Sequence, residues 1–158
     1  VLETILEEAT AIKCAEMLGG AQAVLDMTLD YVKRRVQFGS PIGALQAVQH
    51  HLVNVYRDVE AGRALTHKAL MQLDKGLPAR RHVAMAKAKM NHAYPLATQI
   101  AHQLHGGIGY YTEYPLELYY RRALASQVFL GDTEYHLERI AQELQTFVPY
   151  HPSRMDDF

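Results

Sequence analysis

The sequence predicts an all-α domain folded as an antiparallel four-helix bundle, and three observations predict this fold class. Apolar residues recur at helical spacing over stretches of about 25 to 33 residues, no run alternates with a period of two, and glycines and prolines separate the helical stretches. The 158 residues, of which 49% are hydrophobic and 21% charged, suffice for one domain with its own core. Long helices joined by short loops pack side by side as a bundle.

The first half of the chain predicts two long helices. Residues 2–34 form the first, in which Gly19 and Gly20 cost stability unless another helix crosses closely there. The stretch QFGSPIGA, residues 37–44, contains two glycines and a proline and is expected to be a loop without strands. The second helix is expected from Leu45 to about Lys75, where a glycine follows.

The second half predicts three more helices. They are expected from Pro78 to about His105, from Leu116 to Val128 and from Thr133 to Phe147. The domain therefore covers residues 1–147, and residues 148–158 are expected to form an irregular tail.

Composition excludes several classes of protein. The formal net charge of −1 gives no reason to expect a nucleic-acid partner, and no run of eighteen apolar residues predicts a membrane span. Cys14 is the only cysteine, so we expect a buried thiol and a cytoplasmic location. The chain begins with Val1 rather than methionine, which suggests a piece of a longer protein.

The histidines and acids carry no site by themselves. Nine histidines are present, but no HExxH or CxxC motif is, so we expect no metal site. The acids of the first helix are expected to form a solvated face: Glu3, Glu7, Glu8 and Glu16.

The stretch RRVQFGSPIGALQAVQHH is a candidate binding segment. Arg35 offers a guanidinium suited to phosphate or carboxylate, Phe38 could pack on a flat ring, and Gln46 opens a helix, where anions are favoured. On these grounds alone, a helix–helix loop with a surface arginine is the stronger interpretation.

The stretch QLHGGIGYYTEYP is a second candidate. Gly106 and Gly107 leave the main chain open to a ligand, and Gln103 brings an amide donor and acceptor. A glycine cap followed by a tyrosine-rich packing loop explains the same residues equally well.

These two stretches and GDTEYHLERIAQEL, in this order and spacing, resemble the C-terminal helical domain of acyl-CoA dehydrogenases. The family patterns are R-x-x-F-G-x-x-I-x-x-x-Q, Q-x-x-G-G-x-G-[YF]-T-x-E-[YH] and E-G-T-S-E-I-Q, and the resemblance covers residues 5 to 147. It implies an FAD-dependent oxidoreductase that removes hydrogen from the α and β carbons of an acyl-CoA, as part of fatty acid or lipid metabolism.

The resemblance also implies which residues contact FAD. Arg35 and Gln46 match residues that hold the pyrophosphate and adenosine part across a dimer interface, with Phe38 beside them. A second segment of the family approaches the ADP part of FAD from a neighbouring subunit through its backbone, and it matches Gln103, Leu104, His105, Gly106 and Gly107. The T-S-E residues of the third family pattern also contact the flavin, and they match Asp132, Thr133 and Glu134.

The chain departs from the family at the catalytic base. The usual glutamate of E-G-T-S-E is Leu130, which cannot accept a proton. Some members place the glutamate on the first long helix, at a position that is Ala9 here, followed by Thr10 where an arginine often stands. Both known base positions therefore lack a carboxylate.

Three explanations are open. The favoured hypothesis is that this subunit is the base-free half of a hetero-oligomer whose partner carries the glutamate. The second is a displaced base, Glu8 or Asp132, although Glu8 lies about 100° round the helix from the family position. The third is a structural domain that has lost its flavin function.

The resemblance further implies a tetramer, homomeric or heteromeric, built as a dimer of dimers, with an acyl-CoA substrate and an electron-transfer protein as acceptor. The isolated domain lacks the upstream domains of the family and should be inactive alone. The competing interpretations are a helical module that only mediates oligomerisation, and an acyl-CoA oxidase or flavin monooxygenase on the same fold.

Overall fold

The computed structural model describes residues 1–147, which form five α-helices. They are α1 (Leu2–Arg34), α2 (Gln46–Asp74), α3 (Arg80–His105), α4 (Leu116–Val128) and α5 (Thr133–Phe147). Each helix matches an expected one within two residues at either end. The expected irregular tail lies outside the described residues.

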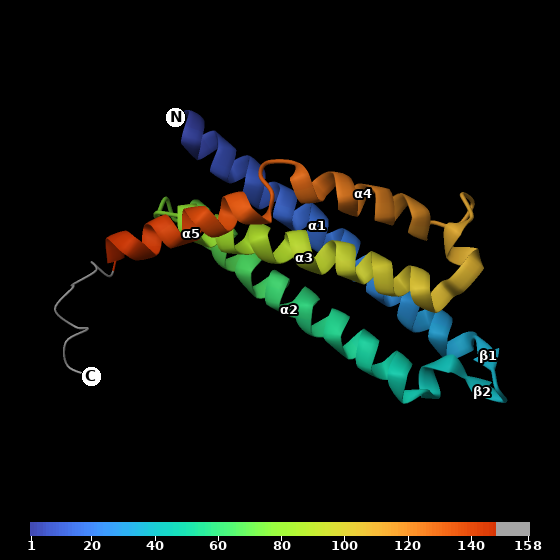
Figure 1. The fold of residues 1–158 in the computed structure, drawn as a ribbon. Coiled ribbons are helices and arrows are strands. Elements are labelled where there is room, and N and C mark those ends of the chain that lie inside the picture. The colour runs from blue at the N-terminus through green and yellow to red at the C-terminus, as the bar shows by residue number, and fades with distance from the viewer. Residues whose placement is uncertain (148–158) are drawn as a thin grey trace, which may run out of the picture.

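The helices form the predicted bundle around α3. This helix packs against all four of the others, and α1 also packs against α2 and α4. Figure 1 shows that α4 and α5 follow one another along the bundle, so that together they make its fourth rod. The core is apolar and small-residue-rich, and Met17, Val24, Val59 and Met90 are completely buried in it.

The expectation that residues 37–44 form a loop without strands is wrong. Val36–Gln37 (β1) pairs antiparallel with Ser40–Pro41 (β2), and Ile42–Ala44 follows as a 3₁₀ helix, η1. Phe38 and Gly39 at the tip both have positive φ, of 54° and 82°, as a two-residue hairpin turn with the twist of its strands requires. Strands of two residues are too short to show a period-two pattern.

The glycine pair in α1 is split between two environments. A Cβ added to Gly20 would lie 2.5 Å from the ring of Tyr94 on α3, whereas one added to Gly19 would meet nothing within 4 Å. Tyr94 is buried, at 3% exposure, and its ring has little room to move aside. The close crossing expected at this pair is therefore made at Gly20.

Two matched substitutions test this crossing. Gly19→Ala should stabilise the protein by up to about 1 kcal/mol, because alanine has the higher helix propensity and the site is open. Gly20→Ala should destabilise it by about 1 to 3 kcal/mol, because the methyl group overpacks the contact with Tyr94. Chemical unfolding of the two variants measures both; equal effects at the two positions would contradict the crossing.

Candidate functional site

The predicted cofactor-contacting residues fall into three groups, which we call the hairpin group, the glycine group and the turn group: Arg35, Phe38 and Gln46; residues 103–107; and residues 132–134. The first two groups lie at one end of the bundle. Tyr31, near the end of α1, stacks on His105 with ring centroids 4.2 Å apart, and its hydroxyl donates to the His105 carbonyl at 3.3 Å. This contact joins the end of α3 to the base of the hairpin.

The turn group lies elsewhere along the bundle (Figure 1). The turn before α5 packs beside Lys87 and Asn91 of α3, through hydrogen bonds to the Gly131 carbonyl. Because a helix rises 1.5 Å per residue, Lys87 and His105 are separated by roughly 25 Å along α3. The structure thus brings two of the three groups together and keeps the third apart.

The hairpin group presents polar and aromatic groups to solvent. Arg35 and Gln46 are exposed, and within residues 1–147 the Arg35 guanidinium makes no hydrogen bond or ion pair. Phe38, at the tip of the hairpin turn, is 92% exposed. No side chain caps the first N–H groups of α2, which begins at Gln46. An unpaired guanidinium and an uncapped helix N-terminus are each suited to an anionic ligand.

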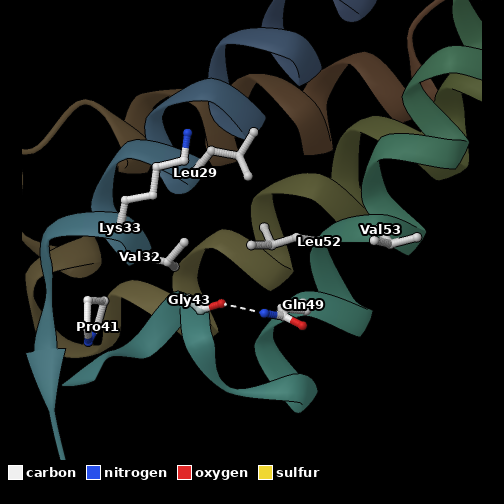
Figure 2. Close-up of a pocket in the computed structure, with 8 residues that line it drawn as sticks. All are labelled: Leu29, Val32, Lys33, Pro41, Gly43, Gln49, Leu52 and Val53. Carbon is white, nitrogen blue, oxygen red and sulfur yellow. Dashed lines mark hydrogen bonds between the residues drawn. The ribbon is translucent and has the colours of Figure 1, made fainter. Parts of the chain in front are cut away.

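A groove of about 420 Å³ runs beside the hairpin between α1 and α2. Figure 2 shows the hydrogen bond by which Gln49 Nε2 donates to the Gly43 carbonyl at 3.0 Å and ties η1 to α2. The walls of the groove are mostly apolar: Leu29, Val32, Lys33, Pro41, Gly43, Gln49, Leu52 and Val53.

The glycine group exposes main chain. Gly106 has φ 61° and caps α3, and Cβ atoms added to Gly106 or Gly107 would meet nothing within 4 Å. Gln103 is exposed, whereas the His105 ring is buried and both of its nitrogens contact groups of the protein itself. Its Nδ1 donates to the Ala101 carbonyl at 2.7 Å and its Nε2 lies 3.1 Å from the Tyr114 hydroxyl. The backbone of this segment, and not the imidazole, is therefore the surface available to a ligand.

The turn group begins α5 with a helix cap. Asp132 Oδ1 accepts the backbone N–H of Tyr135 at 2.9 Å, which leaves the N–H groups of Thr133 and Glu134 at the free N-terminus of the helix. Before it, Leu130 and Gly131 both have positive φ, of 61° and 103°. Asp132 is thus a capping residue in this structure.

A cavity of about 260 Å³ opens at the turn, lined by Leu6, Thr10, Leu130, Gly131, Tyr135 and Arg139. One family position for the base, Leu130, lines this cavity, whereas the other, Ala9, is not among the lining residues. None of the lining residues carries a carboxylate. Neither Glu8, which is exposed, nor Asp132 is among them.

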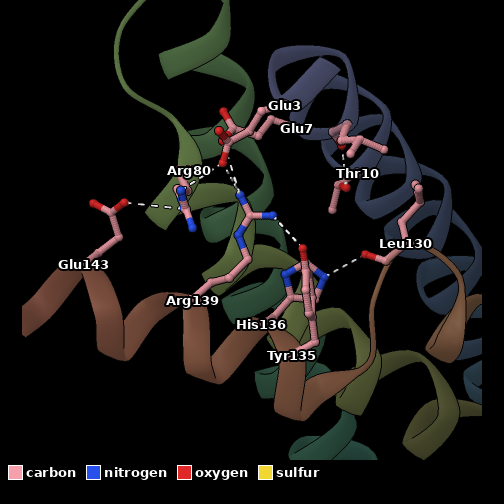
Figure 3. Close-up of polar contacts among 10 residues, drawn as sticks. Glu3, Glu7, Thr10, Arg80, Leu130, Tyr135, His136, Arg139 and Glu143 are labelled. Carbon is pink, nitrogen blue, oxygen red and sulfur yellow. Dashed lines mark hydrogen bonds and ion pairs between the residues drawn. The ribbon is translucent and has the colours of Figure 1, made fainter. Parts of the chain in front are cut away.

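An ion-pair network that the sequence did not indicate closes one side of this cavity (Figure 3). Arg139 Nη2 lies 3.4 Å from carboxylate oxygens of both Glu3 and Glu7, and its Nη1 donates to the Tyr135 hydroxyl at 3.0 Å. Arg80, at the start of α3, pairs with Glu3 at 2.8 Å. The expectation that the acids of α1 form a solvated face is therefore wrong for Glu7, because the Arg139 side chain of α5 reaches it and it is largely buried. Burial raises the pKa of Glu7, while the Arg139 guanidinium opposes this rise.

Two buried polar residues beneath the turn were also missed. Lys87 Nζ donates to the carbonyls of Ser126 and Gly131, at 3.1 and 3.0 Å, and to Asn91 Oδ1. His136 Nε2 donates to the Leu130 carbonyl at 2.9 Å. A helix-period pattern does not distinguish such residues from exposed polar ones, and their roles depend on the turn that packs over them.

Cys14 is confirmed as a buried thiol. It is completely buried, and burial raises the pKa of its thiol to about 12, so it is no nucleophile. Within residues 1–147, no three histidine, cysteine or acidic side chains gather as metal ligands. No helix in this part of the chain is long and apolar enough to cross a membrane.

Comparisons with known proteins agree on one family. The family model described as "Acyl-CoA dehydrogenase, C-terminal domain" matches residues 1–145. Acryloyl-CoA reductase (NADH) of Anaerotignum propionicum is 36% identical over 130 residues, which are 82% of this chain and 33% of that protein. The chain spans between 29% and 43% of the length of the curated relatives it matches.

Two solved structures show the same fold. A glutaryl-coenzyme A dehydrogenase in complex with glutaryl-CoA superposes with a TM-score of 0.87 at 32% identity, over 92% of this chain and 37% of that chain. A steroid ACAD described as Tcur3481-Tcur3483 gives a TM-score of 0.85 at 30% identity, over 90% of this chain and 39% of that chain.

Proposed function

This chain belongs to the acyl-CoA dehydrogenase family, as its C-terminal domain. We propose that it is part of a flavin-dependent oxidoreductase, in which it completes FAD sites and forms oligomer contacts. The substrate class is an acyl-CoA thioester, and the reaction is dehydrogenation between its α and β carbons. The observation that carries this proposal is the pairing of the hairpin and glycine groups at one end of the bundle, joined by the contact of Tyr31 with His105.

The hairpin and glycine groups fit the diphosphate and adenosine part of FAD. The Arg35 guanidinium, unpaired within the described residues, would neutralise the pyrophosphate, assisted by the uncapped N-terminus of α2. The open backbone at Gly106 and Gly107 leaves room for direct approach, since no side chain occupies the Cβ positions. The exposed ring of Phe38 offers a face for stacking.

The separation of the groups supports an oligomer. A single flavin would have to span roughly 25 Å of α3 to meet the glycine group and the turn group of one chain. We infer that each end serves a different flavin, and that the flavin at the hairpin end belongs to a neighbouring subunit. A dimer of dimers, homomeric or heteromeric, satisfies this requirement.

The cavity at Leu130 lacks the carboxylate that the proposed reaction needs as a base. Bound FAD would supply the acceptor for the hydride that leaves the β carbon of the acyl group. Removal of the α proton needs a carboxylate, and the lining of the cavity provides none. We therefore infer that the chain is the base-free subunit of a hetero-oligomer. A displaced base is the second candidate, although Glu8 does not line the cavity and Asp132 is engaged in capping α5.

Flavin content and oxygen consumption separate these proposals from their competitors. A module that only mediates oligomerisation would leave the full-length protein without bound FAD. An acyl-CoA oxidase or flavin monooxygenase would consume oxygen when given acyl-CoA, whereas a dehydrogenase passes electrons to an acceptor protein. We expect bound FAD and no oxygen consumption above background.

A further inference from the structure

We propose that Lys87 is a positioning residue, whose buried ammonium group holds the turn at Leu130 and Gly131 in its left-handed conformation. The turn and its hydrogen bonds are features of the structure itself. That the turn contacts a flavin rests on the function proposed above.

Lys87 is completely buried, yet no carboxylate within residues 1–147 lies in ion-pair range of its Nζ. All three donors of the ammonium group are used, one on Asn91 of its own helix and two on carbonyls of Ser126 and Gly131. A buried charge is costly unless it is fully hydrogen-bonded, and an apolar side chain would fill the same space more cheaply. The two carbonyls belong to the end of α4 and to the turn, so the ammonium group joins both to α3.

The turn needs such support. Leu130 adopts φ 61°, a region that a leucine rarely enters, and Gly131 follows at φ 103°. Both carbonyls of this turn point into the protein. The Leu130 carbonyl accepts from His136, and the Gly131 carbonyl accepts from Lys87 and, at 3.3 Å, from Asn91 Nδ2. Without these donors the carbonyls would be buried and unpaired, and the turn would relax toward ordinary backbone geometry.

The charge at Lys87 is set by its surroundings. Burial lowers the pKa of Lys87 to about 8, against the raising effects of Cys14 on α1 and Asp132 in the turn, while Lys13 lowers it further. Burial also lowers the pKa of His136, so that this imidazole is neutral and donates through Nε2–H. At neutral pH the turn is therefore held by one cation and two neutral donors.

The backbone conformation at residue 130 is therefore set by residues of α3 and α5, and not by the side chain at position 130. The donors contact main-chain carbonyls only, and the Leu130 side chain is free to line the cavity with Thr10 and Leu6. Any side chain at position 130 would be presented to the same space. Lys87 thus fixes the position from which family members present their glutamate.

Hydrogen exchange of the full-length protein, read by mass spectrometry, tests this role in Lys87→Met. We expect protection of the hydrogen-bonded amides that flank the turn, those of Phe129, Tyr135 and His136, to fall at least tenfold while the protection of α1 and α2 is unchanged. Lys89→Met is the matched control, because Lys89 lies on the same helix and pairs with Asp58 at 2.7 Å, away from the turn. Unchanged protection at the turn, or an equal loss in both variants, would overturn the proposal.

A second measurement uses the unmodified protein and does not depend on the folding of a variant. Acylation of amines should label Lys87 no faster than the bonded amides of Tyr135 and His136 exchange, because one opening of the turn exposes both. Labelling of Lys87 while the turn stays protected would contradict the role. Flavin content of the Lys87→Met protein separates this proposal from the proposed function. A loosened turn with unchanged FAD would support the role of Lys87 and count against flavin contact by the turn group.

Discussion

Leu130→Glu is expected to give the full-length protein a base of its own. With FAD bound and no partner subunit present, an acyl-CoA should reduce the flavin anaerobically about 10² to 10⁴ times faster than in the unmodified protein, the range that a positioned general base contributes. The measurement is the rate of flavin bleaching in a stopped-flow spectrophotometer.

The structure gives three reasons for this expectation. Position 130 already lines the cavity of about 260 Å³ at the turn. A glutamate adds no backbone strain, because neither leucine nor glutamate favours the φ of 61° that the scaffold imposes. Arg139 lines the same cavity and would favour an ionised carboxylate there.

Leu130→Gln is the matched control, since glutamine has nearly the shape of glutamate but accepts no proton at neutral pH. Bleaching with Leu130→Glu and none with Leu130→Gln would identify the missing carboxylate as the defect. If both variants stay inactive while FAD remains bound, the cavity is not the site of proton removal and the role assigned to position 130 is wrong.

Arg35→Ala is expected to weaken FAD binding by roughly 10- to 100-fold. A hydrogen bond to a charged group contributes about 1.5 to 3 kcal/mol, and each 1.4 kcal/mol is a factor of ten in affinity. Because the guanidinium has no partner within residues 1–147, its removal should leave the stability of the bundle unchanged. Flavin content after gel filtration, with the dissociation constant of re-added FAD, measures the effect.

The neighbouring Arg34→Ala controls for loss of surface charge. Arg34 is also exposed, but its Nε donates to the Asp30 carbonyl within α1 at 3.1 Å. Only Arg35→Ala should release flavin. Equal flavin retention in both variants would favour the interpretation of the domain as an oligomerisation module.

Periodicity predicted the helices well because each buries a continuous apolar stripe on α3 or α1, and the stripe is visible in the sequence. Periodicity did not predict the hairpin at Val36–Pro41, because its strands are only two residues long. Gly39 suits the positive φ at the tip, but Phe38 also has positive φ, and phenylalanine is not a residue type that indicates it.

The candidate site divides in the same way. Arg35 and the glycines of the glycine group belong to short local motifs, and the resemblance of these motifs to those of a family is what predicts a cofactor contact there. The contacts of Arg139 with Glu7 and of Lys87 with Gly131 join residues 132 and 44 positions apart in the chain. Such contacts depend on how α5 and the turn pack against the other helices, so no local sequence pattern predicts them.

The central claim is that this chain completes FAD sites but lacks the base. The most direct test takes the full-length protein with and without its partner subunit, records bound FAD, and titrates each sample anaerobically with acyl-CoA. We predict FAD in the complex and bleaching of the flavin only when the partner is present. Bleaching by the chain alone would show that it holds a carboxylate, such as Glu8, that reaches the α proton, and would contradict the base-free interpretation of Leu130.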